Sequence, residues 1–104
     1  MVTERKKKSK PLEKQVQAAI AKLLRRYGYS VDIITKGLYG SNGISDIIAC
    51  KDGRYVAIEV KRDPSIKPSP LQAEWLKDKR AHGAIAFCVG SVVEVIEKLG
   101  IEIN

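Results

Sequence analysis

Two carboxylates and an amine near the middle of the chain, Asp46, Glu59 and Lys61, have residue types that suit chemistry on a phosphodiester. Carboxylate oxygens are ligands that Mg²⁺ prefers, and a bound Mg²⁺ keeps its other positions for water and phosphate oxygens. Such an ion activates an attacking water and stabilises charge on a phosphoryl group. The three side chains could therefore support metal-dependent hydrolysis, provided that the fold brings them together.

A turn signal between the two carboxylates predicts how they meet. Asp52-Gly53 is flanked by two apolar, β-prone runs, which is typical of a hairpin with a two-residue type I′ turn. Counting outward from this turn gives the cross-strand pairs Lys51–Arg54, Cys50–Tyr55, Ala49–Val56, Ile48–Ala57, Ile47–Ile58 and Asp46–Glu59. Lys61 lies two residues beyond Glu59, on the same face of the strand.

Opposed like charges need an explanation, because they destabilise a sheet. A divalent cation between Asp46 and Glu59 removes the conflict. The alternative is that Asp46 merely ends a strand while Glu59 and Lys61 lie on a solvated sheet face. The register, the spacing and the third charge agree with one another, and they favour a metal site.

An Asp followed at a hairpin's distance by Glu-Val-Lys resembles the motif of the PD-(D/E)xK nuclease superfamily. The segments 43–48 (Gly-Ile-Ser-Asp-Ile-Ile) and 57–61 (Ala-Ile-Glu-Val-Lys) resemble the VRR-NUC family of small phage and bacterial nucleases. The resemblance extends from Glu13 to about Cys88, and Ser45 stands where the superfamily's name has Pro. It implies an α/β protein with a restriction-endonuclease-like αβββαβ core, in which helices flank a mixed central sheet.

The resemblance also implies a ligand set and a mechanism. Asp46, Glu59 and the backbone carbonyl of Val60 would bind Mg²⁺ or Mn²⁺. Lys61 would position or deprotonate the attacking water and stabilise charge on the phosphate.

Two further residues match positions that matter in this superfamily, and each also has a structural explanation. Resolvase-type members often have a first-helix Glu that reaches the metal directly or through water, and Glu13 matches it; a first-turn Glu is equally explained by the helix dipole. A Gln or Lys in the helix after the hairpin faces the catalytic centre, and Gln72 matches it. Gln72 is also the third residue of a capping box that begins at Ser69.

The remaining pattern supplies the elements that would hold these residues. Apolar residues from Leu12 to Tyr27 recur at the spacing of an amphipathic helix. A strand is expected over 29–35, a helix over 70–81 with Leu71, Trp75 and Leu76 inward, a buried strand over 84–89, a helix from Ser91 to Leu99, and a short edge strand at Ile101 and Ile103.

The segment 36–45 contains three glycines and leads into Asp46. It lacks the spacing of a phosphate-binding P-loop. It is either an ordinary connection or a loop that lines the strand and presents Lys36 and Tyr39 to nucleic acid, and the sequence favours neither.

Composition favours a polyanionic partner. The chain has 104 residues with a net charge of +7 and a pI near 9.5, which indicates nucleic acid rather than membrane. We expect one domain over residues 11–104, preceded by a basic flexible arm over residues 1–10. In this arm Lys6, Lys7 and Lys8 are candidate phosphate contacts.

No apolar run is long enough to span a bilayer and no signal-peptide pattern follows the basic start, so we expect a cytoplasmic protein of a bacterial or phage-infected cell. Cys50 and Cys88 lie in predicted strands among apolar neighbours, where a free Cys behaves as a small hydrophobe. Neither has the spacing of a zinc site.

These observations predict a metal-dependent DNA endonuclease. The resemblance suggests structure-specific cleavage of four-way junctions or other branched DNA, and so short a chain would need a homodimer to cut two strands. A helicase partner is left open. The rival is a non-catalytic basic DNA-binding or scaffolding module in which the acidic pair is vestigial. A small RNA-binding α/β domain is less favoured, because Tyr55 is the sole aromatic residue of the central hairpin.

Overall fold

The residues that the structure describes form a four-stranded sheet with three helices, in the predicted order. The structure is a computed structural model that describes residues 12–34 and 45–103. The elements are α1 (Glu13–Arg26), β1 (Ser30–Ile33), β2 (Ile47–Lys51), β3 (Arg54–Val60), α2 (Pro70–Ala81), β4 (Ile85–Val89) and α3 (Val92–Leu99). Within these described ranges, no helix is long and apolar enough to cross a membrane.

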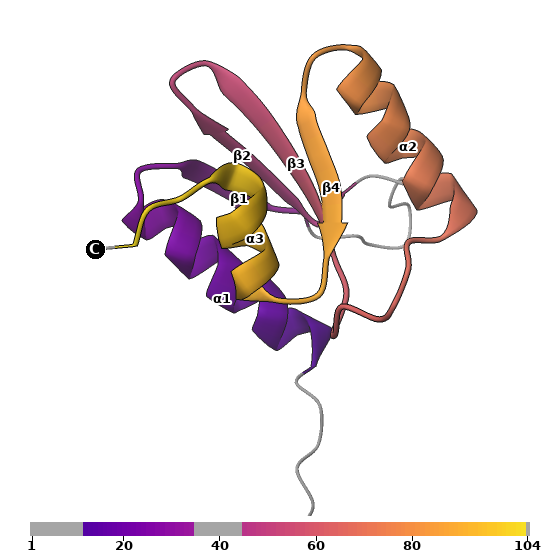
Figure 1. Ribbon diagram of the computed structural model, residues 1–104, viewed down its shortest axis with the longest axis horizontal. Helices are drawn as coiled ribbons and strands as arrows, with labels where there is room; N and C mark the ends of the chain where they lie inside the picture. Colours follow the sequence, from indigo (N-terminus) through magenta and orange to yellow (C-terminus); the bar gives the residue numbers. More distant parts are fainter. Residues whose placement is uncertain (1–11, 35–44, 104) are drawn as a thin grey trace, which may run out of the picture.

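The strands lie in the order β1-β2-β3-β4 (Figure 1). β2 is antiparallel to both of its neighbours, β1 and β3, whereas β4 runs parallel to β3. A parallel neighbour requires a crossover, and α2 supplies it. The predicted mixed central sheet is therefore confirmed.

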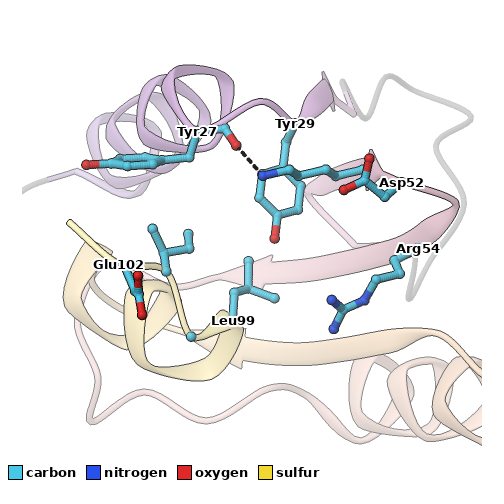
Figure 2. Close-up of a pocket in the computed structure, with 9 residues that line it drawn as sticks. Tyr27, Tyr29, Asp52, Arg54, Leu99 and Glu102 are labelled. Carbon is cyan, nitrogen blue, oxygen red and sulfur yellow. Dashed lines mark hydrogen bonds between the residues drawn. The ribbon is translucent and has the colours of Figure 1, made fainter. Parts of the chain in front are cut away.

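The hairpin between β2 and β3 has the predicted register. Asp52 and Gly53 have φ values of 51° and 79°, as a two-residue type I′ turn requires. The five predicted pairs from Lys51–Arg54 to Ile47–Ile58 are all present. The Lys51 ammonium donates to the carbonyl of Tyr27 at the end of α1 (2.8 Å; dashed line in Figure 2), which ties the hairpin tip to the first helix.

Helices pack on both faces of the sheet (Figure 1), and each face has its own core. On one face α1 and α3 pack on all four strands through a large cluster that includes Ile20, Leu24, Ile58 and Val95. On the other face α2 packs on β3 and β4, where a smaller cluster contains Ala57, Leu76 and Ala86. The two cores explain why β3 is buried on both sides.

Helix starts follow from local sequence. The Ser69 hydroxyl accepts from the amide of Gln72 (3.2 Å) while the Gln72 side chain accepts from the amide of Ser69 (2.9 Å), which completes the predicted capping box. Ser91 caps α3 in the same way, by accepting from the amide of Glu94 (3.3 Å). The Glu94 carboxylate, however, accepts from the amide of Gly90 (2.6 Å) and not from that of Ser91.

Three local expectations were wrong. Residues 101–103 form no strand, because the amide of Ile101 donates to Ile96 at the end of α3 (3.1 Å). Leu71 is 50% exposed, since it lies five residues, or about 140° around the helix, from the buried Leu76. Cys50 is exposed because α2 packs on β3 and β4, away from β2.

Candidate active site

The predicted site residues converge at one end of the sheet, where β2 begins and the antiparallel β3 ends. Asp46 directly precedes β2, Glu59 is the penultimate residue of β3, and Lys61 follows that strand. Gln72 lies in the first turn of α2, which starts at the same end. Four side chains that are distant in sequence thus become neighbours.

Asp46 is held by backbone bonds on both sides. Its side chain is buried, with 6% exposure for the residue, and Oδ2 accepts from the amide of Val60 (2.8 Å). Its own carbonyl accepts from the amide of Ile34 (2.7 Å). Continued by one residue past the last ladder pair, the hairpin register puts Asp46 opposite Glu59, and the bond to Val60 fixes the carboxylate there.

Glu59, Lys61 and Gln72 form one hydrogen-bonded network. Glu59 is 2% exposed, and its Oε2 accepts from Nε2 of Gln72 (2.7 Å) and lies 3.5 Å from Nζ of Lys61. Nζ of Lys61 in turn donates to Oε1 of Gln72 (3.0 Å). Glu59 is buried and Lys61 and Gln72 are half-buried, which contradicts the alternative that Glu59 lies on a solvated sheet face.

Gln72 combines the two roles that the sequence left as alternatives. Its Oε1 accepts both the Ser69 amide of the capping box and the Lys61 ammonium, while its Nε2 donates to Glu59. One amide side chain therefore caps the N-terminus of α2 and also orients the acid and the amine. Through this side chain, the position of the first turn of α2 determines how Glu59 and Lys61 are oriented.

The segment between Lys61 and Gln72 is fixed by a close contact with the turn after β4. The amide of Lys61 donates to the carbonyl of Val89 (2.8 Å). At the next residue, Gly90, an added Cβ would lie 2.0 Å from the backbone carbon of Asp63. Only glycine lets the two backbones approach so closely, and this contact sets the path that brings α2 back to Glu59.

The donor set at this end fits a hard divalent cation. Asp46 and Glu59 are buried carboxylates on adjacent strand ends, and Mg²⁺ typically takes one or two protein carboxylates. The N–H of Val60 points towards Asp46, so its C=O points to the same side of the strand and is available as the third predicted ligand.

Glu13 is placed close to Asp46 but not in direct contact with both carboxylates. Among residues 12–34 and 45–103, no group of three or more His, Cys, Asp and Glu side chains is arranged to hold a metal ion. Glu13 lines an open cleft of about 480 Å³ that also reaches Asp46. A contact between Glu13 and a metal through water is compatible with this position.

Cys88 is a neighbour of the site that the sequence pattern did not reveal. It pairs with Glu59 across the parallel β3–β4 ladder. Burial, followed by the nearby Glu59 carboxylate, raises the pKa of the Cys88 thiol from 9.0 to about 11. Parallel register cannot be counted from a turn, so no sequence signal pointed to this contact.

The predicted nucleic-acid contacts fall outside the described residues; they are Lys6, Lys7, Lys8, Lys36 and Tyr39. His82 is an exposed cap at the end of α2, as expected. A second cleft, of about 380 Å³, lies at the hairpin tip between Tyr29, Arg54 and Leu99 (Figure 2), at the opposite end of β3 from Glu59.

Comparison with solved structures finds a chain described as "VRR_NUC domain". The TM-score is 0.73 at 27% sequence identity, and the match covers 88% of this chain and 97% of the other. No family model and no curated protein matches the sequence. The likeness spans nearly the whole of both chains, and it confirms the predicted α/β architecture.

Proposed function

The structural match identifies the chain as a member of the VRR-NUC family with a nuclease-type domain, and we propose that it is a metal-dependent DNA endonuclease. The observation that carries the proposal is the buried group at the end of the sheet. Asp46 and Glu59 are 6% and 2% exposed, and Lys61 and Gln72 are bonded around Glu59. A protein rarely buries two carboxylates side by side without a ligand or a reaction that needs them.

Asp46, Glu59 and the carbonyl of Val60 would hold Mg²⁺ or Mn²⁺, with Glu13 reaching the ion through water. When bound, the cation supplies Lewis-acid stabilisation of the charge that develops on the phosphoryl group. The bond from the Val60 amide orients the Asp46 carboxylate towards this position. The bond from Gln72 does the same for Glu59.

Lys61 would act on the substrate itself. Its side chain is 16% exposed, and Nζ lies 3.0 Å from Oε1 of Gln72 and 3.5 Å from Oε2 of Glu59. An amine fixed at the mouth of the site can orient the attacking water and interact with a phosphate oxygen as negative charge builds up. Gln72 is then a positioning residue, because it touches Lys61 and Glu59 rather than the substrate.

We further propose that the substrate is branched DNA, including four-way junctions, and that two copies of the chain cut the two strands. The described part of the chain presents one such site, and two coordinated cuts need two. Residues 1–10, with five basic side chains, would serve as an arm that adds phosphate contacts to the domain over residues 11–104. Light scattering with and without a junction tests the dimer.

The decisive experiment incubates the purified protein with labelled linear, flap and four-way-junction DNA in Mg²⁺, Mn²⁺ or EDTA. We expect cleavage that requires the metal and is lost in Asp46→Asn, Glu59→Gln and Lys61→Ala. Asp32→Asn is the matched control, because Asp32 is an exposed carboxylate on β1. Binding of DNA without cleavage under every condition would instead support the rival, a non-catalytic DNA-binding module.

A further inference from the structure

The cleft beside Asp46 has the composition of a small-ligand site. One wall is the start of α1, and the floor is the end of β1. The lining residues are Glu13, Lys14, Gln17, Ala18, Ile33, Ile34 and Asp46. Its volume of about 480 Å³ falls within the range of pockets that bind small molecules, and it joins the candidate active site through Asp46.

The floor of this cleft is apolar although it is open to water. Ile33 is 41% exposed at the end of the edge strand β1, and Ile34 is half-buried next to it. Ala18, on the facing helix, is exposed and has too small a side chain to cover them. Two partly exposed isoleucines in a concave site favour an apolar ligand surface, such as a deoxyribose or the face of a nucleobase.

The rim is polar and includes a cation. Lys14 and Gln17 are three residues apart on α1, so their side chains are neighbours on the helix surface. Within residues 12–34 and 45–103, the ammonium group of the Lys14 side chain makes no hydrogen bond or ion pair. An ammonium group binds a phosphate oxygen as a point charge, and a Gln amide can both donate to and accept from a base edge.

We infer that this cleft binds one nucleotide of the substrate strand, next to the phosphodiester that is presented to Asp46 and Glu59. The sugar or base lies on Ile33 and Ile34, and the phosphate is bound by Lys14. This inference rests on the proposed nuclease function, and it deepens it by assigning the path of the strand to the gap between α1 and β1.

The carboxylates that line the cleft determine how the binding of a nucleotide depends on divalent cations. Asp46 and Glu13 both line the cleft and repel an approaching phosphate. A divalent cation held by Asp46 and Glu59 cancels that repulsion, so the nucleotide should bind more tightly with Ca²⁺ than in EDTA. The cleft at the hairpin tip lies at the other end of β3, so a cation held by Asp46 and Glu59 should not change binding there.

The first test is an amide-shift titration of the ¹⁵N-labelled protein with a single-stranded tetranucleotide of deoxythymidine, in Ca²⁺ and in EDTA. We expect the largest shifts over residues 14–18 and 33–34, with a lower dissociation constant in Ca²⁺. The amides of residues 51–54 are the internal control. Shifts concentrated at residues 51–54, or none at millimolar nucleotide, would overturn the inference.

The second test compares Lys14→Gln with Lys22→Gln by fluorescence anisotropy of a labelled single strand in Ca²⁺. Both lysines are exposed on α1, but Lys22 does not line the cleft. We expect Lys14→Gln to weaken binding about 10-fold and to reduce the slope of log affinity against log salt by roughly 0.7. Equal effects of the two substitutions would refute the inference that the cleft binds the strand.

These readouts separate the inference from the proposed function. If the wild type binds at residues 14–18 and 33–34 but never cleaves DNA, the nuclease proposal fails and the cleft stands. If it cleaves DNA with metal while Lys14→Gln changes neither affinity nor KM, the nuclease proposal stands and the cleft fails.

Discussion

Replacing Gln72 by Glu tests whether Nε2 of Gln72 donates a hydrogen bond to Glu59, the contact on which the network depends. Glu is a favoured residue at this helix position, because it completes a capping box and complements the helix dipole. Local helix chemistry therefore predicts a neutral or stabilising change. The structure predicts the opposite, since the substitution turns a donor 2.7 Å from a buried carboxylate oxygen into a second carboxylate.

Two quantities bound the loss in the free energy of unfolding: the energy of the lost hydrogen bond and the cost of binding a proton. The lost bond to a charged group is worth about 1.5–3 kcal/mol. The variant can escape the repulsion between carboxylates by binding one proton, which for a Glu with an ordinary pKa near 4.3 costs about 3.7 kcal/mol at pH 7 and about 1 kcal/mol at pH 5. A shared proton also restores a hydrogen bond between the two acids. We therefore expect a loss of about 2–3.7 kcal/mol at pH 7 and no more than about 1 kcal/mol at pH 5.

The sign of the pH dependence is fixed by proton binding. Between pH 5 and pH 7 the folded variant holds a proton that the unfolded chain has released, so its stability relative to the wild type falls as the pH rises. The assay is urea unfolding followed by fluorescence of Trp75, which is half-buried on α2. Lys61 stays beside both acids and moderates the loss.

Gln15→Glu is the matched control. Gln15 occupies the same position in α1, where its Oε1 accepts from the amide of Leu12 (2.9 Å) at an exposed site. This variant should change the free energy of unfolding by less than about 0.5 kcal/mol at either pH. If Gln72→Glu behaved like Gln15→Glu at pH 7, the contact between Gln72 and Glu59 would be refuted.

Three further predictions follow from the same end of the sheet. Gly90→Ala should cost at least about 3 kcal/mol or prevent folding, because the new Cβ meets backbone at 2.0 Å, whereas Gly53→Ala in an open turn should cost about 1 kcal/mol; similar chemical denaturation midpoints would contradict this. At pH 8 the thiol of Cys88, with a pKa of about 11, should react with iodoacetamide on the order of 100-fold more slowly than exposed Cys50; mass spectrometry of timed samples measures both rates, and equal rates would show that Cys88 is not shielded. Millimolar Mg²⁺ or Mn²⁺ should raise the melting temperature of the wild type, because the ion binds only the folded state, and should raise that of Asp46→Asn little; an equal rise in both would place the ion elsewhere.

The hairpin was predictable because its register depends on local chemistry. Asp52-Gly53 requires two residues with positive φ, and once that turn is fixed every pair back to Ile47–Ile58 follows by counting. The same holds for Ser69, whose role as a cap depends on residues within one turn. The two carboxylates could therefore be brought to one end of the sheet from sequence alone.

Features that depend on contacts between distant segments were not accessible in this way. The pairing of Glu59 with Cys88 depends on how the crossover through α2 sets a parallel register, which no turn determines. Leu71 was wrongly placed inward, since the pattern of α2 does not say which apolar residue meets the sheet. The exposure of Ile33 likewise depends on where α1 lies over β1, so the cleft could not be predicted from the sequence.

Because Gln72 belongs both to the helix cap and to the site, local unfolding of the first turn of α2 also disassembles the site. Helix ends fray more readily than cores, and the first turn of α2 is held by the amides of Gln72 and Ala73, which donate to Ser69 at 3.2 Å and 2.8 Å. Whenever this turn unwinds, the bond from Gln72 to Glu59 and the bond from Lys61 to Gln72 are lost together. Hydrogen exchange at these two amides therefore measures the fraction of molecules in which the acid and the amine are correctly oriented, and a substitution that strengthens the cap increases that fraction without touching either residue.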